Sequence, residues 1–157
     1  MPTMEHQDST PPAMFPAPPS WVPVSRDVFL ERMLSANHLL NGDWIPDVLL
    51  ALSSGPLRYT ELLDAIRSSP VVDARTQRGR HVQPRILLNT LRRMEDDGLV
   101  LRHEKSIGLD RSVQYELTPA AHELLSALTS TVTWCERHQT LIARADQQAV
   151  RRHRGRA

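Results

Sequence analysis

The fold of this chain is decided by one stretch, VQPRILLNTLRRMEDDGLVLRHEKSIGLDRSVQYEL, residues 82–117. In its first half, apolar residues recur at the spacing of an amphipathic helix, which predicts a helix over 84–97. Gly98 follows directly and is a typical residue for ending a helix. The stretch therefore opens with a helix that has one apolar face.

Two short runs with strand character follow this helix, 99–104 and 113–117. The residues between them, 105–112, are polar and contain a glycine, so we expect a turn there. Together the three segments form a β-hairpin. A helix pair followed at once by a hairpin is the outline of a winged helix-turn-helix.

The expected helix has two chemically different sides. Residues at i, i+4 and i+7 share one side of a helix. The apolar side consists of Leu87, Leu91 and Met94, and the opposite side of Arg85, Asn89 and Arg92, bordered by Leu88 and Arg93. Arginine can bond a guanine edge through two donors, asparagine can do the same with adenine, and leucine can touch a thymine methyl. This pattern predicts a helix that reads DNA in the major groove.

Positive charge is concentrated around this helix. The segment 67–93 contains seven arginines, Arg67, Arg75, Arg78, Arg80, Arg85, Arg92 and Arg93, against the single acid Asp73. The segment thus has a net charge of +6, whereas the whole chain has a formal net charge of +1. Because phosphate neutralisation dominates the affinity of DNA-binding proteins, this distribution favours duplex DNA as a partner.

Two helices are expected near the start of the ordered chain. Ser25 is a good N-cap for an apolar-striped helix that reaches about Leu40. Asp43 is expected to cap the second helix, with Pro46 tolerated in its first turn and 54–56 ending it.

An extended piece over 57–59 leads to a third helix, for which Thr60 is the expected cap and Arg67 the end. Residues 68–81 have the composition of a loop.

The last helix is expected to start at Thr118, an N-cap followed by proline at the first helical position. It reaches at least Arg137, with an end at Val150 as the alternative, before the basic end 151–156. The predicted fold class is mainly α, in the α+β sense, with a small hairpin wing and N- and C-terminal dimerisation helices.

Three regions of different composition divide the chain. Residues 1–24 hold seven of the twelve prolines, which predicts a disordered tail and leaves a partner-binding tail as the alternative. Residues 25–137 form the predicted DNA-binding domain, and 138–157 a helical extension with a basic tail.

The sequence contains no motif that is typical of another class of function. There is no phosphate loop, nucleophile elbow or paired carboxylate motif, so neither an enzyme nor a cofactor is expected. The seven histidines show no ligand spacing, which argues against a metal site: His6, His38, His81, His103, His122, His138 and His153. No apolar run is long enough to cross a membrane and no signal peptide is evident, so a cytoplasmic protein is expected.

Cys135 is the only cysteine, which excludes an intramolecular disulfide. We interpret it as a small apolar residue at a dimer seam. A redox switch is the alternative, but it requires an exposed thiolate with basic neighbours, and only Arg137 qualifies.

Four segments and one tryptophan carry a resemblance to a known family: DWIPDVLLAL (43–52), GPLRYTELLDAI (55–66), VQPRILLNTLRRMEDDGLV (82–100), VQYELTPAAHELL (113–125) and Trp134. Together they resemble the HxlR family of bacterial regulators, a branch of the MarR-like winged-helix group. Residues 91–100, LRRMEDDGLV, closely match the family signature leucine-arginine-x-leucine-glutamate-x-x-glycine-leucine-valine. The resemblance covers about 28–137. It implies a dimer built from the first and last helices, a DNA-reading fourth helix, and a wing that grips the minor groove or the backbone.

The chain departs from the family pattern in four places. The first helix has no cysteine between Arg26 and Leu34, where some members sense oxidants. About thirteen extra residues, 69–81, precede the fourth helix; we expect them to aid DNA binding or its control, with a plain surface loop as the alternative. The wing tip lacks the usual prolines and is one residue longer. Ala121 replaces the usual glycine after the second wing strand.

The sequence thus predicts a bacterial transcription regulator that binds double-stranded DNA as a homodimer and responds to a small-molecule effector. The expected DNA contacts are Arg58, Thr60, Arg75, Arg78, Arg80, Gln83, Arg85, Leu88, Asn89, Arg92, Arg93, Lys105 and Arg111. The expected dimer contacts are Phe29, Met33, Leu124, Leu128, Val132 and Trp134. The alternative is a winged-helix protein-interaction module that has lost DNA binding.

Overall fold

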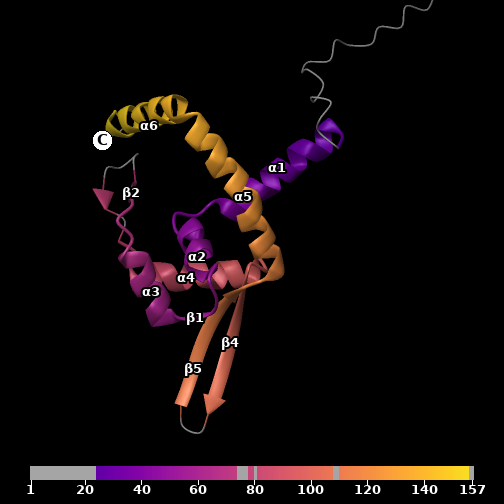
Figure 1. Ribbon diagram of the computed structural model, residues 1–157, viewed down its shortest axis with the longest axis vertical. Helices are drawn as coiled ribbons and strands as arrows, with labels where there is room; N and C mark the ends of the chain where they lie inside the picture. Colours follow the sequence, from indigo (N-terminus) through magenta and orange to yellow (C-terminus); the bar gives the residue numbers. More distant parts are fainter. Residues whose placement is uncertain (1–23, 74–77, 80, 108–109, 156–157) are drawn as a thin grey trace, which may run out of the picture. The chain divides into compact units, whose positions relative to one another are not determined.

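The computed structural model describes residues 24–73, 78–79, 81–107 and 110–155 (Figure 1). The predicted tail lies outside this range except for Val24. The chain divides after Leu39 into two units, and each is described by itself.

The first unit contributes nearly all of α1 (Arg26–Leu40), which begins one residue after the predicted cap Ser25. The carbonyl of Ser25 accepts the N–H of Phe29 at 2.9 Å. None of the side chains of α1 is buried, and four of its large apolar residues are exposed: Phe29, Leu30, Met33 and Leu34. This helix therefore keeps most of its apolar surface in contact with solvent.

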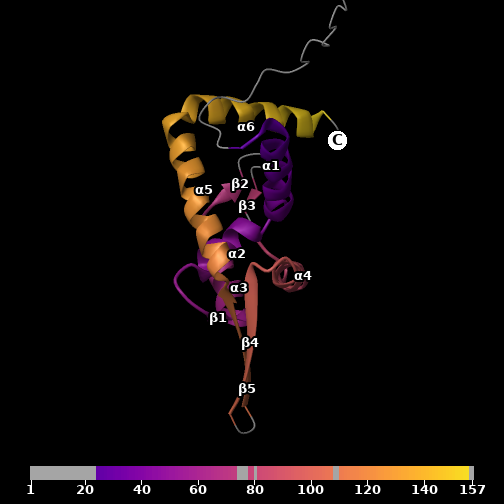
Figure 2. The same cartoon turned by 90° about the vertical axis from the view of Figure 1, so that its right-hand side faces the viewer.

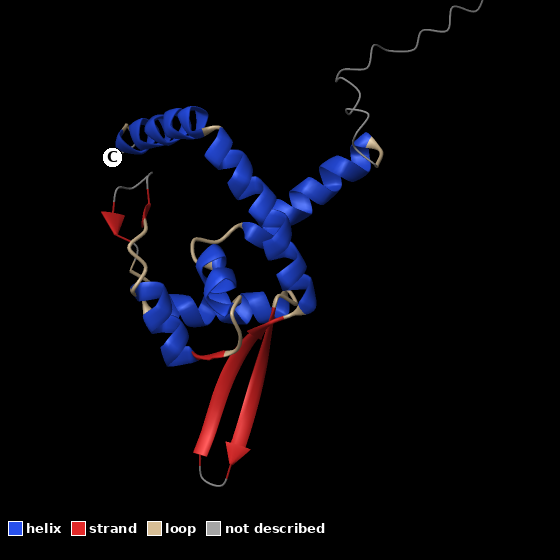
Figure 3. Ribbon diagram, viewed as in Figure 1, coloured by secondary structure: helices blue, strands red, loops and turns tan. Residues whose placement is uncertain are grey.

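The second unit contains the remaining elements, coloured by type in Figure 3. They are α2 (Ile45–Leu52), β1 (Leu57–Arg58), α3 (Tyr59–Arg67), β2 (Val72–Asp73), β3 (Arg78–Gly79), α4 (Pro84–Asp96), β4 (Val100–Ile107), β5 (Asp110–Leu117), α5 (Pro119–Arg137) and α6 (Gln139–Arg154). The order of helices around the hairpin confirms the predicted winged helix-turn-helix. The helix before the wing and both strands of the wing are present where they were predicted, but both strands extend further toward the tip.

One hydrophobic core holds α2, α3, α4, the base of the hairpin and the start of α5 together. Its buried side chains come from these elements and from the residues just before and after α4: Ile45, Val48, Leu49, Leu52, Leu62, Ile66, Val82, Leu87, Leu91, Met94, Leu99, Val100, Tyr115, Leu117 and Ala121. The predicted apolar stripe of α4 is fully inside, since Leu87, Leu91 and Met94 are 0% exposed. Burying each such side chain contributes about 1.5–3 kcal/mol.

The sheet is antiparallel in the order β1-β5-β4. Leu57 of β1 pairs with Tyr115, and the β4–β5 ribbon pairs from Val100↔Leu117 to Ile107↔Asp110. The predicted turn over 105–112 is wrong, because most of these residues continue the two strands. Cross-strand hydrogen bonds, which a polar composition does not reveal, extend the wing (Figures 1 and 3).

The end of α4 is set by Gly98, as predicted. Its φ of +75° is a backbone conformation that glycine adopts without strain. Its N–H bonds the carbonyl of Glu95 at 3.1 Å, and the N–H of Leu99 bonds that of Met94 at 2.8 Å. This pair of bonds is a Schellman motif, and it turns the chain from the helix into β4.

Thr118 caps α5 as the sequence predicts. Its Oγ1 accepts the N–H of Ala121 at 3.1 Å and donates to the carbonyl of Gly98 at 2.9 Å. One hydroxyl thus joins the start of α5 to the end of α4. Ala121, at the position where the family has glycine, is 0% exposed in the core.

Two predicted caps are wrong. The N-cap of α2 is Trp44 rather than Asp43, and the Trp44 side chain forms no capping hydrogen bond. Helix α3 begins at Tyr59, one residue before the predicted cap Thr60, because the Glu61 carboxylate accepts the N–H of Arg58 at 2.7 Å. An acceptor from inside the first turn replaces the expected hydroxyl.

Two further expectations need correction. The segment 68–81, predicted as loop, contains a short antiparallel pair in which Val72 faces Gly79. The last helix is not continuous, because it breaks at His138, with φ −118° and ψ 37°, and resumes as α6. Helix α6 also includes part of the predicted basic tail, up to Arg154.

Removing a core side chain of α4 tests this packing. We expect Leu91→Ala to lower the free energy of unfolding by about 2–5 kcal/mol, because it leaves a cavity beneath the helix. The matched control is Leu101→Ala on the exposed side of the wing, where Leu101 is 43% exposed; there we expect a change within about 0.5 kcal/mol. Denaturant unfolding measures both, and equal losses would contradict the core assignment.

Candidate nucleic-acid interface

Helix α4 turns its apolar stripe inward and its polar row outward. Because Leu87, Leu91 and Met94 are buried, the residues half a turn away are forced to the surface. The row of Arg85, Asn89 and Arg92 is exposed as predicted, and Leu88 beside it is half-buried. In Figure 2, α4 is seen along its axis beside the base of β4. The helix thus presents donors suited to base edges next to the wing.

Two side chains of α3 fix where α4 begins. The hydroxyl of Tyr59 donates to the carbonyl of Pro84 at 2.7 Å. Arg67 donates from Nε and Nη2 to the carbonyl of Val82, at 3.2 and 3.1 Å, and the Val82 side chain is 0% exposed. These bonds span 25 and 15 residues of sequence and close the insertion at its base. The geometry between α3 and α4 is therefore held independently of the inserted residues.

Arg93 has a structural contact that its position in the sequence does not reveal. Its Nη1 donates to the carbonyl of Asn41, and its Nε lies 3.4 Å from Oδ2 of Asp97. The guanidinium thus joins the end of α4 to the turn before α2. Of the three arginines predicted on this helix, Arg85 and Arg92 form the exposed row, and Arg93 is turned away from it.

The wing carries its two predicted cations on opposite faces. Lys105 pairs with Ser112 and Arg111 with Ser106, and neighbouring pairs of an antiparallel ladder point to alternate sides. Arg111 therefore shares a face with Val113 and Tyr115, the face that meets α4 at its base. Lys105 lies on the other face, on which His103 contacts Glu116 at 3.1 Å. The two cations do not form one contact surface.

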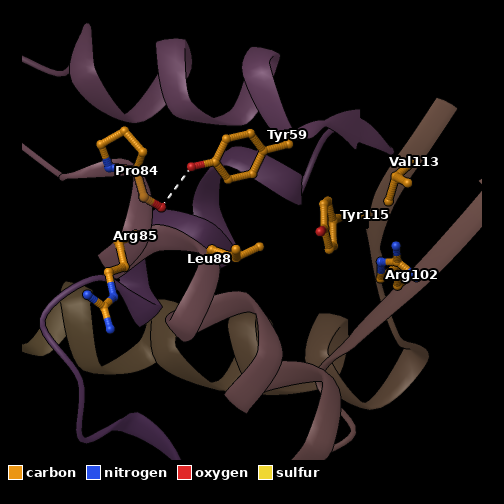
Figure 4. A pocket seen from close by; sticks show the side chains of 7 residues that line it. All are labelled: Tyr59, Pro84, Arg85, Leu88, Arg102, Val113 and Tyr115. Atoms are coloured by element: carbon orange, nitrogen blue, oxygen red, sulfur yellow. Dashed lines mark hydrogen bonds between the residues drawn. The ribbon is translucent and has the colours of Figure 1, made fainter. Parts of the chain in front are cut away.

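A groove of 430 Å³ lies between α4 and the wing (Figure 4). It is lined by Tyr59, Pro84, Arg85, Leu88, Arg102, Val113 and Tyr115. A second groove of 280 Å³ adjoins it and includes Arg92 and Glu95, so an acid lies beside the end of the arginine row. The sequence singled out only Arg85 and Leu88 of the first groove. The one available signal was that Val113 and Tyr115 are two residues apart on a strand and so share a face.

Arg102 stands at the wing side of the groove and is ion-paired with Glu104. Hydrogen bonds to Glu104 and Tyr115 raise the pKa of its guanidinium above the usual value. This arginine is therefore permanently charged but already partnered, unlike the row on α4.

The remaining predicted DNA contacts are dispersed. Arg58, Thr60 and Gln83 are exposed, at the start of α3 and just before α4. The backbone of Arg78 belongs to β3. Arg75 and Arg80 lie outside the described residues, so their role stays a prediction.

The predicted dimer residues of α5 fall into two groups. Leu124 and Leu128 are half-buried and pack against the chain's own core. Beyond them Val132 and Trp134 are 57% and 41% exposed, and the Trp134 ring lies 4.7 Å from that of His138. The first half of α5 thus belongs to the domain, and the second half projects from it.

Within the described parts of the chain, no three His, Cys, Asp or Glu side chains gather closely enough to hold a metal ion. None of the helices there combines the length and apolar character that a membrane crossing requires.

Comparison with known families gives a match over most of the chain. The profile of the HxlR-like helix-turn-helix family matches residues 39–142, from the end of α1 into α6. This chain belongs to that family. The match confirms the resemblance seen in the sequence, and it covers the α3–α4 pair, the wing and α5. At this coarse level the chain is a DNA-binding transcription regulator of helix-turn-helix type.

Solved structures show the same fold. A transcriptional regulator of the MarR family from Enterococcus faecalis V583 is 28% identical, with a TM-score of 0.59 over 80% of this chain and 99% of that one. Reduced YodB from B. subtilis is 22% identical, with a TM-score of 0.55 over 68% and 90%. The redox regulator HypR in its reduced form is 20% identical, with a TM-score of 0.56 over 71% and 96%. A search among curated proteins found no match.

Proposed function

We propose that this HxlR-like chain is a sequence-specific regulator that binds duplex DNA as a homodimer under the control of a small-molecule effector. One observation carries the proposal. The exposed row of Arg85, Asn89 and Arg92 stands on a helix whose other side is locked in the core, directly before a long hairpin. Such a helix fits the major groove with its polar row toward the bases, while the hairpin reaches along the adjoining backbone.

Base recognition and phosphate contact are assigned to different elements. On α4, Arg85 and Asn89 lie near the N-terminal end, which is the part of a recognition helix that meets base edges. On the wing, Arg111 shares the face that meets α4, so it is the favoured phosphate contact. Arg58, Thr60 and Gln83 are proposed to contact the backbone and fix the register. The insertion arginines Arg75, Arg78 and Arg80 are proposed to add charge beside α4.

Unpartnered apolar surface supports the homodimer. The half of α5 beyond Leu128 exposes Val132 and Trp134, and α1 exposes Phe29 and Met33. Large exposed apolar residues on two helices outside the core are typical of an interface. A symmetric pair of such surfaces would present two copies of α4 to a palindromic site.

DNA binding is tested by selecting bound sequences from a pool of random duplexes. We expect a defined palindromic site. We expect Arg85→Ala and Asn89→Ala each to weaken binding to this site by about 1–3 kcal/mol. Each should also relax the base preference at one position per half-site. Arg111→Ala is expected to weaken binding to all DNA sequences alike. It should also lower the slope of log K against log salt concentration by about one unit.

The matched control is Arg144→Ala on α6, which should bind as the unmodified protein does. If no duplex is selected, the chain is better described as a protein-interaction module. If the α4 variants retain both affinity and preference, α4 is not the recognition helix.

The homodimer is tested by light scattering at micromolar concentration, where we expect twice the mass of one chain. Trp134→Asp should raise the dissociation constant at least about tenfold, since a charge in the seam is left unpaired. Leu101→Asp, a matched change on the exposed wing, should leave the mass unchanged. A stable monomer of the unmodified chain would contradict the proposal and the palindromic site with it.

Oxidants are not expected to act on this chain. A structure of diamide-treated YodB is among those similar in fold, whereas this chain has only Cys135, half-buried in α5. One cysteine cannot form an intramolecular disulfide. We expect diamide to leave DNA affinity unchanged within about twofold, with Cys135→Ser as the control. Loss of affinity in the unmodified protein but not in that variant would show redox control between subunits.

A further inference from the structure

Helix α4 is tied to the rest of the domain by side-chain hydrogen bonds at both of its ends. At its start, two side chains of α3 donate to the carbonyls of Val82 and Pro84. In its last turn, Nη1 of Arg93 donates to the carbonyl of Asn41, in the turn before α2. The buried stripe fixes the rotation of the helix about its axis, whereas a tie at each end restricts the tilt of that axis.

The Arg93 guanidinium is closely surrounded on the side of this contact. Its Nε lies 3.4 Å from Oδ2 of Asp97, and the side chains of Arg93 and Asp97 are 36% and 24% exposed. A methyl group added to Gly42 would lie 3.5 Å from Nη1 of Arg93 and 2.9 Å from Cδ1 of Ile45. Hydrogen bonds from a charged donor are roughly twice as strong as those between neutral groups. The end of α4 and the turn before α2 are therefore joined by a tight, charge-assisted contact.

The neighbouring arginine has different surroundings. Arg92 is exposed in the polar row, whereas Arg93 is half-buried and turned toward the turn before α2. Consecutive residues of a helix point in directions about 100° apart. For Arg93 to reach DNA, its guanidinium has to leave the carbonyl of Asn41. Two adjacent side chains of the same charge are thus suited to different tasks.

We propose that Arg93 is a positioning residue for DNA recognition, which sets the tilt of α4 and thereby the base preference of the polar row without contacting DNA. The inference rests on the proposed function, because it concerns how that row is aimed. With the Arg93 contact removed, α4 tilts about the end that α3 holds. The inference therefore predicts unequal effects along the row.

The size of these effects follows from helix geometry. A tilt of about 10° about the start of α4 moves the backbone at Asn89 by about 1 Å and that at Arg85 by about 0.3 Å. A binding side chain has to be held within about 0.5 Å of its productive position. Loss of the Arg93 contact should therefore impair the reading by Asn89 more than the reading by Arg85.

The test compares Arg93→Met with Arg92→Met, the matched change at the next residue. Both are selected against random duplexes, with the base positions assigned by Arg85→Ala and Asn89→Ala. For Arg93→Met we expect the base preference at the Asn89 position to fall at least about threefold, and less at the Arg85 position. The slope of log K against log salt concentration should stay unchanged, because no phosphate contact is lost.

The control variants should behave differently. Arg92→Met should lower DNA affinity but retain the base preference at the Asn89 position. Arg93→Lys should restore most of that preference, because an ammonium group can still donate to the carbonyl of Asn41. A residue that only adds stability would lower the melting temperature and leave the base preference as it is.

The tilt is also measured without DNA, from residual dipolar couplings of the backbone N–H bonds of α4 and α2. We expect Arg93→Met to change the couplings of α4 as a set relative to those of α2, and Arg92→Met to leave them unchanged. Thermal unfolding establishes that the variants are folded. Should Arg93→Met unfold, Gly42→Ala decides the question. Because the Ile45 side chain is 1% exposed and has little room to move, the added methyl displaces the turn and the Asn41 carbonyl with it, and the same changes are expected.

The inference is overturned if Arg93→Met retains both the base preference and the couplings. It is also overturned if the salt slope of this variant falls by about one unit, as expected for a lost phosphate contact. Both outcomes leave the proposed function intact, since the unmodified chain still selects a defined site. An unmodified chain that selects no duplex loses the proposed function, and the inference with it.

Discussion

The burial of Leu87, Leu91 and Met94 is the constraint on which the rest of this structure depends. Three side chains on one stripe, each 0% exposed, fix the rotation of α4 about its own axis. Once that rotation is fixed, the helical period places Arg85 and Asn89 on the opposite side of the helix, at the surface. Truncating the stripe would therefore affect more than stability, since the orientation of the polar row follows from the same contacts.

The position of α4 along the chain depends on a second constraint. Arg67 and Tyr59 donate hydrogen bonds to the carbonyls of Val82 and Pro84, from the two ends of α3. A turn between such helices is ordinarily short, and here the insertion lengthens it. The hydrogen bonds from Arg67 and Tyr59, together with the buried Val82 side chain, close that insertion at its base. The chain thus tolerates extra residues before α4, because loop length costs little free energy once the two ends of the loop are held.

The wing shapes the surface beside α4. The groove between α4 and the wing exists because the β4–β5 ribbon is paired beyond the core and stands apart from the helix. Leu88 is half-buried on the wall of this groove.

The sequence by itself determined the local features of this protein. The stripe of α4, the Gly98 ending and the Thr118 cap follow from spacing and from residues whose preferences act within one or two turns. Tertiary structure alone decided the partners: Arg93 bonds Asn41, 52 residues away, and the strand register puts Lys105 and Arg111 on opposite faces. It also decided the length of the wing and the groove, because pairing across strands and the meeting of distant side chains depend on contacts that a linear pattern does not encode.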